Sequence, residues 1–355
     1  MVSFVFFGTS DNSIIVLDKL IKSGYKCSAV ITIPDKPIGR KQILTPSPVK
    51  LYAQKNNIPV FSTSNLNDLS NTLNIPNKNT GGAGGKAPDS AQRFFASTGG
   101  KACPERAKRV KGETRDRTRF INLGIVADFG LLIPAELIKT FPRGILNLHP
   151  SLLPAYQGAT PAPIQILRGK KQGGITIITI NERFDEGSIL AQQKFPINKN
   201  ETTVSLLLMS FTLGAQLLVN LLPNYLTGKL KPLPQNLTKK SYFPRLSRDD
   251  GFISWNTLKK AVKGNSITES EKPRFMQISK SSVLSSQFIV ERAIRALTPW
   301  PGVWTEITIK DQLKRLKLLK SHIKGNKLIL DLVQLEGKNP VSWSQFQQAY
   351  QNDII

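Results

Sequence analysis

An amide, an imidazole and a hydroxyl occupy alternate positions in the segment 144–154. Asn147, His149 and Ser151 are each two residues apart, and the first two end an apolar run that reads as a buried strand. Because residues two apart on a strand face the same side, Asn147 and His149 should project together from its end. An imidazole beside an amide donor can stabilise negative charge on a carbonyl oxygen under attack. A structural histidine beside a loop-capping asparagine explains the same residues equally well.

A carboxylate that could serve this pair follows the next apolar run, residues 175–180. Glu182, Asp185 and Glu186 lie close together in the loop after it. Asp185 could hold His149 protonated, or accept the proton of an amine nucleophile, in ordinary general acid–base fashion. The sequence does not choose among the three acids, and spacing alone favours a solvated acidic turn.

Other common catalytic apparatus is missing from the sequence. The first apolar run ends in Gly8-Thr9-Ser10 without the glycine pattern of a dinucleotide site, and no P-loop motif occurs. With two histidines and two cysteines in the chain, no metal-ligand spacing and no disulfide framework can be formed. We therefore expect no metal.

Strands that alternate with helices must position these side chains. Such alternation predicts an α/β layer with a mostly parallel sheet, and open sheets of this kind bind ligands at the carboxyl ends of their strands. A helix of residues 203–222 should stop at Pro223. The predicted strands are 2–7, 28–33, 58–61, 124–129, 144–149 and 175–180, with helices through 14–21 and 48–55.

The C-terminal third has a different pattern. Short runs at 305–309, 317–321 and 327–335, with a turn signal at 324–326, predict antiparallel strands and a small β-barrel. Residues 310–327 hold seven Lys and Arg against one Asp, as a nucleic-acid-binding surface would. Trp300, Trp304 and Trp343 could stack on bases, but core or domain-contact roles are the more frequent outcome for such rings.

Two segments interrupt these patterns. Residues 77–120 are rich in glycine and carry 11 Lys and Arg against 4 Asp and Glu, so we expect a largely disordered basic insertion. Residues 259–287 are polar and rich in Ser and Lys, which predicts a second loop insertion. Between them, residues 230–241 hold two prolines and no period, as in an extended linker.

Charge gives the strongest indication of the partner. The 355-residue chain carries a net charge of +25, which attracts polyanions such as nucleic acid or anionic membrane surfaces. Lys36, Arg40 and Lys41 lie in a Pro- and Gly-braced loop, where they suit phosphate contact or a solvated turn equally well. The start of the chain lacks a signal-peptide pattern and the apolar stretch 121–138 is interrupted by charge and proline, so we expect a cytoplasmic protein with no membrane span.

Taken together, the motifs resemble the methionyl-tRNA formyltransferase family. The Asn-x-His-x-Ser-Leu-Leu-Pro run is specific to folate-dependent formyltransferases, and the basic loop and the Pro-Trp-Pro region indicate the branch that acts on tRNA. The matching segments, in the family's order, are 6–11, 34–40, 46–50, 127–134, 147–154, 184–187 and 295–301.

The resemblance implies an α/β fold: a Rossmann-like formyltransferase domain at residues 1–228, which contains the 77–120 insertion. A linker at 229–245 and an OB-like tRNA-binding domain at 246–355, with its own insertion at 259–287, would follow. It also implies a monomer that transfers a formyl group from 10-formyltetrahydrofolate to methionyl initiator tRNA during translation initiation.

The resemblance further assigns roles to residues of this sequence. Asn147 and His149 would stabilise the developing oxyanion, and Asp185 would orient the histidine and assist proton transfer. Lys36, Arg40 and Lys41 would contact tRNA. The folate pocket would be formed by two segments: Ala127, Asp128, Phe129, Gly130, Leu131 and Leu132 in the first, and Ser151, Leu152, Leu153 and Pro154 in the second.

Two alternatives remain open at this point. A folate-dependent formyltransferase for a small amine, such as glycinamide ribonucleotide or an amino sugar, would share the chemistry but would not need so basic a C-terminal region. An RNA-binding protein with an inactive formyltransferase domain would keep the charge without the reaction.

Overall fold

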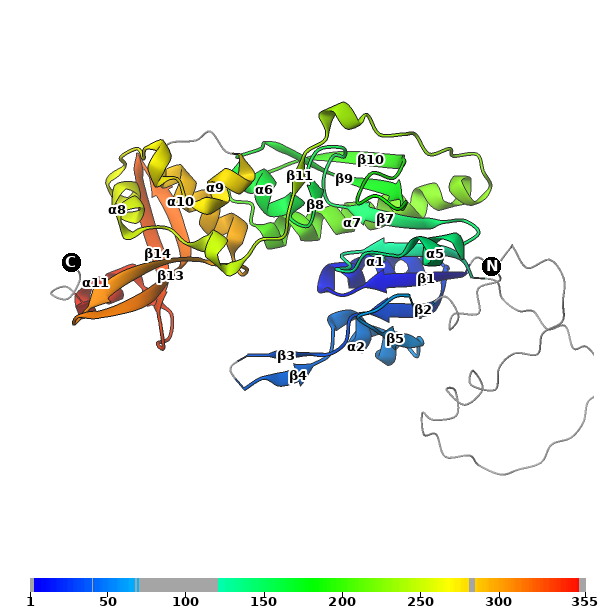
Figure 1. The fold of residues 1–355 in the computed structure, drawn as a ribbon, viewed down its shortest axis with the longest axis horizontal. Helices are drawn as coiled ribbons and strands as arrows, with labels where there is room; N and C mark the ends of the chain where they lie inside the picture. The colour runs from blue at the N-terminus through cyan, green and yellow to red at the C-terminus, as the bar shows by residue number, and fades with distance from the viewer. Residues whose placement is uncertain (1–2, 40, 68, 70–120, 281–284, 351–355) are drawn as a thin grey trace, which may run out of the picture.

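The computed structural model of the chain describes residues 3–39, 41–67, 69, 121–280 and 285–350. A seven-stranded sheet forms the larger part, and a four-stranded sheet lies at the opposite end of the molecule (Figure 1). The basic insertion expected at 77–120 lies outside the described residues.

The central sheet has the order β10-β9-β7-β6-β1-β2-β5. Its five strands from β7 to β5 are parallel, and β9 is antiparallel to both of its neighbours. The mostly parallel α/β fold predicted from the sequence is confirmed. The strands are β1 (Ser3–Gly8), β2 (Lys26–Thr32), β5 (Val60–Ser62), β6 (Ile121–Ala127), β7 (Ile145–His149), β9 (Gln172–Thr179) and β10 (Ile189–Pro196).

Both faces of the middle strands of this sheet are buried, which explains why β1 has an unbroken apolar run from Phe4 to Phe7. Phe4 and Phe6 of β1 pack in one cluster, while Val5 and Phe7 pack in a second cluster on the other face. Helices α1 (Asp11–Lys22) and α7 (Thr203–Leu226) pack into the first cluster and α5 (Ala135–Lys139) into the second. Before residue 230 the chain also forms α2 (Pro48–Lys55), β8 (Gln157–Gly158) and α6 (Pro161–Leu167).

Helix α7 continues past Pro223, so the predicted stop there is wrong. Proline at this position removes only one backbone donor, and the turn after it is held by tertiary contacts. Tyr225 and Leu226 pack against the first core cluster, and the Tyr225 hydroxyl donates a hydrogen bond to the Arg143 carbonyl at 2.7 Å. By length and composition α7 could cross a membrane. One face of the helix, with Phe211, Leu218 and Leu222, packs into the first core cluster of this protein.

The loop predicted at residues 34–43 contains a β-hairpin. Strands β3 (Lys36–Ile38) and β4 (Ile43–Thr45) pair antiparallel and project from the sheet towards the end of the molecule that carries the C-terminal sheet (Figure 1). The Lys50–Asp35 ion pair, at 2.7 Å, fixes the base of this hairpin to α2.

The segment after α7 is more ordered than a plain linker. Leu233 forms a bridge with Ile189 of β10, and a short 3-10 helix, η1 (Leu237–Lys239), follows. Strand β11 (Tyr242–Phe243) then pairs parallel with β8. This segment therefore returns to the central domain before the chain enters the C-terminal part.

The C-terminal part is a small antiparallel β-domain, as predicted. Its sheet has the order β12-β13-β14-β15, with Leu316, Leu318 and Val333 buried against helices. The same apolar cluster includes Ile164 and Leu167 of α6, so the core continues into the central domain. The strands are β12 (Val303–Ile309), β13 (Gln312–Lys324), β14 (Lys327–Leu335) and β15 (Val341–Ser342); the helices are η2 (Arg248–Gly251), α8 (Trp255–Lys263), η3 (Glu269–Glu271), α9 (Arg274–Ser279), α10 (Ser286–Leu297) and α11 (Trp343–Tyr350).

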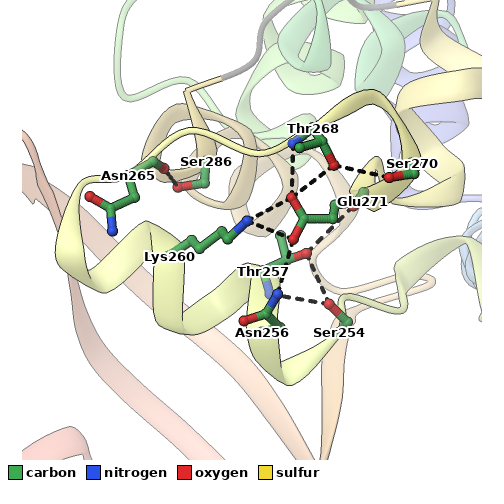
Figure 2. Close-up of polar contacts among 9 residues, drawn as sticks. All are labelled: Ser254, Asn256, Thr257, Lys260, Asn265, Thr268, Ser270, Glu271 and Ser286. Atoms are coloured by element: carbon green, nitrogen blue, oxygen red, sulfur yellow. Dashed lines mark hydrogen bonds and ion pairs between the residues drawn. The ribbon is translucent and has the colours of Figure 1, made fainter.

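Residues 259–287 are not the loop that the polar composition suggested. Apart from 281–284, which lie outside the described residues, the segment holds the end of α8, then η3, α9 and the start of α10, and it buries Phe275 and Met276. The Lys260 ammonium contacts both Glu271 carboxylate oxygens, at 2.6 and 2.7 Å, and Glu271 also accepts from Thr268 (Figure 2). A few apolar anchors and this polar network order a segment whose average composition is that of a loop.

The Lys260–Glu271 contact should make the stability of this region depend on pH. The hydrogen bond from Lys260, followed by that from the Thr268 backbone, lowers the pKa of Glu271 to about 2. A lowered folded-state pKa adds stability above the unfolded-state value, and this gain disappears as the pH falls towards the folded-state pKa. We expect Glu271→Gln to be less stable than the parent near neutral pH, and the difference to shrink as the pH falls from about 5 towards 2.

Urea unfolding across this pH range measures the effect. Glu269→Gln is the matched control, because Glu269 is 75% exposed in its pair with Lys272. A stability difference that stays constant with pH would contradict the assigned cause.

Candidate active site

Asn147 and His149 lie at the carboxyl end of β7, in the middle of the central sheet. The strand is fixed on both sides, since Asn147 is opposite Val126 of β6 and Ile178 of β9. Asn147 is partly exposed, whereas His149 retains only 5% of its accessible surface. Pro150 cannot extend the ladder, and the chain turns away at that point. The strand pattern thus brings these two side chains to one edge, as predicted.

His149 is held between two acceptors. Its Nε2 lies 2.8 Å from the Tyr156 carbonyl oxygen, so this nitrogen carries the hydrogen that is donated. Its Nδ1 faces Asp185 Oδ1 at 3.6 Å, a contact between two side chains that are 6% and 7% exposed. That separation exceeds a hydrogen bond, as is common for catalytic pairs without substrate. In its protonated form the ring presents a second N–H, on Nδ1, beside a buried carboxylate.

Three residues with left-handed backbone surround this imidazole. Tyr156 and Asp185 have φ values of 62° and 54°, and Gly158 has a φ of 100°. A Cβ on Gly158 would lie 2.2 Å from the Phe243 carbonyl oxygen, so only glycine fits there. The Gly158 amide donates to Asp185 Oδ2 at 2.9 Å. Backbone conformations that cost energy are typical of functional sites, where the surrounding structure maintains them.

The structure separates Asp185 from the two neighbouring acids. Glu186 turns away from His149 towards Lys240 and Arg183, at 3.4 and 3.6 Å. Glu182 is exposed. Of the three candidates in this loop, Asp185 is the one that faces the imidazole.

The first predicted folate-pocket segment begins where β6 ends. Asp128, with a φ of 49°, accepts hydrogen bonds from Ser10 at 2.5 Å and Asn12 at 3.2 Å at the start of α1. The remaining positions divide between packing and exposure. Ala127 is buried in the core, Phe129 packs on the Phe7 ring, Leu131 is partly buried, and Gly130 and Leu132 are exposed, Leu132 by 63%.

The second predicted pocket segment is largely turned inward. Ser151 is fully buried and donates to the Ala155 carbonyl at 2.8 Å. Leu153 is also buried, and its amide donates to Thr176 Oγ1 at 3.1 Å. Leu152 and Pro154 are partly buried. Ser151 and Leu153 therefore shape the loop beside His149, which leaves Leu152 and Pro154 as the members able to meet a ligand.

The predicted tRNA-contacting residues lie on the β3–β4 hairpin, apart from the histidine and its carboxylate. Lys36 begins β3 and Lys41 lies in the turn, and both are exposed. Arg40 lies outside the described residues.

Two glutamines that the sequence analysis did not identify hold the Asp185 loop. Gln235 Nε2 donates to the carbonyl oxygens of Asp185 and Gly187, both at 2.7 Å, and Gln157 Nε2 donates to the Asp185 carbonyl at 3.3 Å. Gln235 comes from the segment after α7, which is distant in sequence. No local sequence pattern indicates Gln235, because its role depends on the segment after α7 folding back against the Asp185 loop.

We expect Gln235→Ala to loosen this loop. The Gly187 carbonyl would lose its donor and the Asp185 carbonyl would keep only the longer bond from Gln157, which should cost about 1–3 kcal/mol in the free energy of unfolding. A displaced Asp185 should lower turnover about tenfold or more, because small misplacements of catalytic groups are costly. Denaturant unfolding and steady-state kinetics measure both effects. Gln216→Ala, on the exposed face of α7, is the control; equal turnover in the two variants would contradict the positioning role.

Two other kinds of chemistry find no support in the described residues. Burial raises the pKa of the Cys27 thiol to about 12, so this cysteine is no nucleophile at neutral pH. Within the described ranges, no group of three His, Cys, Asp or Glu side chains is arranged to hold a metal ion.

A groove of about 1190 Å³ between α6, α10 and β13 includes none of the predicted catalytic residues.

Comparison with known proteins gives a consistent picture. A protein-family model described as "Formyl transferase" matches residues 2–222. The methionyl-tRNA formyltransferase of Enterococcus faecalis is 30% identical over 308 residues, covering 86% of this chain and 75% of the relative. That of Bacillus cereus is 31% identical over 307 residues, covering 86% and 76%.

Solved structures support the fold. An N-formyltransferase from Helicobacter canadensis, in complex with folinic acid and dTDP-3-aminofucose, superposes with a TM-score of 0.54 at 18% identity. The match covers 91% of this chain and 88% of that one.

Proposed function

The chain belongs to the methionyl-tRNA formyltransferase family of formyl transferases, and we propose that it transfers the formyl group of 10-formyltetrahydrofolate to the amino group of methionyl initiator tRNA. The observation that carries the proposal is the buried His149–Asp185 pair beside Asn147, at the carboxyl edge of the central sheet. Relatives at 30–31% identity over 86% of the chain support the choice of substrate.

Each member of the trio has a distinct proposed task. The amine attacks the formyl carbon, and negative charge develops on the formyl oxygen. Asn147 donates its amide N–H groups to that oxygen, and His149 in its imidazolium form offers the N–H on Nδ1, because its Nε2 already donates to Tyr156. Asp185 keeps the ring in position and accepts the proton that the amine loses. The same proton passes to the tetrahydrofolate nitrogen as its bond to the formyl carbon breaks, which releases tetrahydrofolate.

The residues at the end of β6 and β7 suit a folate as formyl donor. Leu132 offers exposed apolar surface. The partly buried groups are Phe129 and Leu131 in the same segment, and Leu152 and Pro154 in the loop after β7. The bound donor supplies an activated formyl group, and no residue of the proposed mechanism requires a metal. We assign Ala127–Leu132 and Ser151–Pro154 as the segments that form this pocket.

The division of labour along the chain follows from this assignment. Residues 1–228 would carry the chemistry, 229–245 would connect, and 246–355 would bind tRNA together with Lys36, Arg40 and Lys41. A net charge of +25 suits a tRNA partner. We further propose that the protein acts as a monomer in the cytoplasm, where its tRNA substrate is found.

Direct assay of the product tests the proposal. The purified chain is incubated with 10-formyltetrahydrofolate and methionine-charged initiator tRNA, and formyl-methionyl-tRNA is measured. Parallel reactions contain dTDP-3-aminofucose or glycinamide ribonucleotide. Formylation of the tRNA alone supports the proposal. Formylation of a small amine alone would favour the first alternative, and tight tRNA binding without any formylation would favour an inactive RNA-binding protein.

A further inference from the structure

A small pocket in the C-terminal domain has no part in the proposed chemistry. It has a volume of about 290 Å³ and is framed by the Pro299-Trp300-Pro301 segment between α10 and β12. Arg248 of η2 and Arg315 and Lys317 of β13 line its other sides. This hollow combines an aromatic ring with three cationic side chains and one carboxylate, that of Glu336.

The two tryptophans at this pocket differ in burial. Trp304 is 9% exposed, packs on Phe252, and donates its Nε1 hydrogen to the Arg248 carbonyl at 3.1 Å. Trp300 is 57% exposed and is held between two prolines. An exposed ring of this size contributes little to the core, and its apolar surface gains free energy only when something covers it. Trp304 thus has the core role expected for these tryptophans, whereas the ring of Trp300 remains exposed.

The cations gather here because of the strand period. Leu316 and Leu318 of β13 point into the core, so Arg315 and Lys317 point to the outer face. The Arg315 guanidinium lies 4.2 Å from the centre of the Trp304 ring. Its buried Nε has no hydrogen-bond partner in the described part of the chain.

Two acids lie near these cations without cancelling their charge. Glu336 also lines the pocket, and its carboxylate accepts the Arg315 backbone N–H at 3.3 Å. Glu306 lies opposite Arg315 in the strand register. The lining therefore carries three cationic side chains against one carboxylate, which leaves net positive charge beside an exposed indole.

We propose that this pocket binds an unpaired nucleotide of the tRNA, with Trp300 stacked on the base and with Arg248, Arg315 and Lys317 beside the adjoining phosphates. A flat ring with surrounding cations is the arrangement by which proteins hold single-stranded nucleic acid. The pocket has room for one base and not for a duplex. That the RNA is a tRNA rests on the proposed function. The ability of the pocket to hold one base and its phosphates does not depend on that function.

Substitution of Trp300 tests the stacking contact. We expect Trp300→Ala to weaken binding of uncharged initiator tRNA about tenfold, as loss of one stacked base does, and Trp300→Phe to retain most of the affinity. Affinity for a fully paired RNA duplex should stay unchanged in both variants. Phe288→Ala removes another half-exposed aromatic ring, on α10, and should leave tRNA affinity unchanged.

Two further readouts separate stacking from a general structural effect. Bound tRNA should quench tryptophan fluorescence in the parent protein, and this quenching should be smaller in Trp300→Phe. In the formylation assay, Trp300→Ala should raise KM for the tRNA about tenfold while kcat stays near the parent value.

Unchanged tRNA affinity in Trp300→Ala would overturn the inference, as would an equal loss of affinity for the duplex. A parent protein that shows this Trp300-dependent binding but no formylation would leave the pocket standing and refute the proposed function. If the parent formylates tRNA but Trp300→Ala has the same KM for tRNA, the proposed nucleotide pocket is refuted and the proposed function is not.

Discussion

We expect His149→Ala to lower kcat for tRNA formylation by a factor of about 10² to 10³, the usual effect of losing one oxyanion donor. His149 contributes the N–H on Nδ1 from a buried position at the end of β7, and alanine leaves no donor there. The tRNA contacts lie elsewhere, so the affinity for charged tRNA should remain close to that of the parent. Single-turnover kinetics with saturating donor measure the chemical step directly.

The second histidine provides the matched control. His322 is 54% exposed and contacts Asp331 at 2.9 Å on the C-terminal sheet. His322→Ala should keep the parent kcat. Near-normal turnover by His149→Ala would refute the proposed mechanism, and the loss of tRNA binding by the same variant would show that the substitution disturbs the fold.

The replacement Asp185→Asn should be about equally damaging, with a fall in kcat of about 10² to 10⁴, the range that general acid–base groups supply. The amide keeps the size of the side chain and can still accept the Gly158 N–H, but it removes the negative charge 3.6 Å from His149 Nδ1. It also cannot take up the proton released by the amine. The KM for tRNA should change little, because the Asp185 side chain is buried, at 7% exposure, and has no proposed contact with the tRNA body.

Glu186→Gln is the control for charge in the same loop. Glu186 pairs with Lys240 and Arg183, so its loss should affect the loop surface and leave kcat within a small factor of the parent. If Glu186→Gln were as inactive as Asp185→Asn, the assignment of Asp185 as the acid–base group would be wrong. The double variant of His149 and Asp185 should be little worse than either single one, because residues that act as a unit are not additive.

Much of the central fold could be predicted because it depends on local patterns. Most strands of the sheet are apolar runs bounded by glycine, proline or polar residues, as in the segments that became β1, β2 and β7; the edge strand β10, with its polar centre, was not predicted. The same period of two placed Asn147 and His149 on one side of their strand. In the C-terminal region, the short runs at 305–309, 317–321 and 327–335 and the turn signal at 324–326 predicted β12, β13 and β14.

The errors concern segments whose order comes from distant contacts. The helices within residues 259–287 are held by Phe275 and Met276 in the shared core and by the Lys260–Glu271 pair. The last turn of α7 survives Pro223 because Tyr225 reaches the Arg143 carbonyl. Average composition and single helix breakers describe isolated chains, and they miss stabilisation from partners far along the sequence.

The sequence by itself determined the sheet, the carboxyl-end location of Asn147 and His149, and a basic partner surface, because strand period and net charge are properties of the chain alone. Spacing left Glu182, Asp185 and Glu186 as candidates, and the tertiary structure shows that Asp185, which the family resemblance also implied, is the one that meets His149. It also decided that Gln235 holds that loop and that Trp300 stays exposed while Trp304 is buried. These outcomes depend on contacts between segments that are distant in the sequence. The spacing of three nearby carboxylates in one loop does not determine which of them contacts the end of a distant strand.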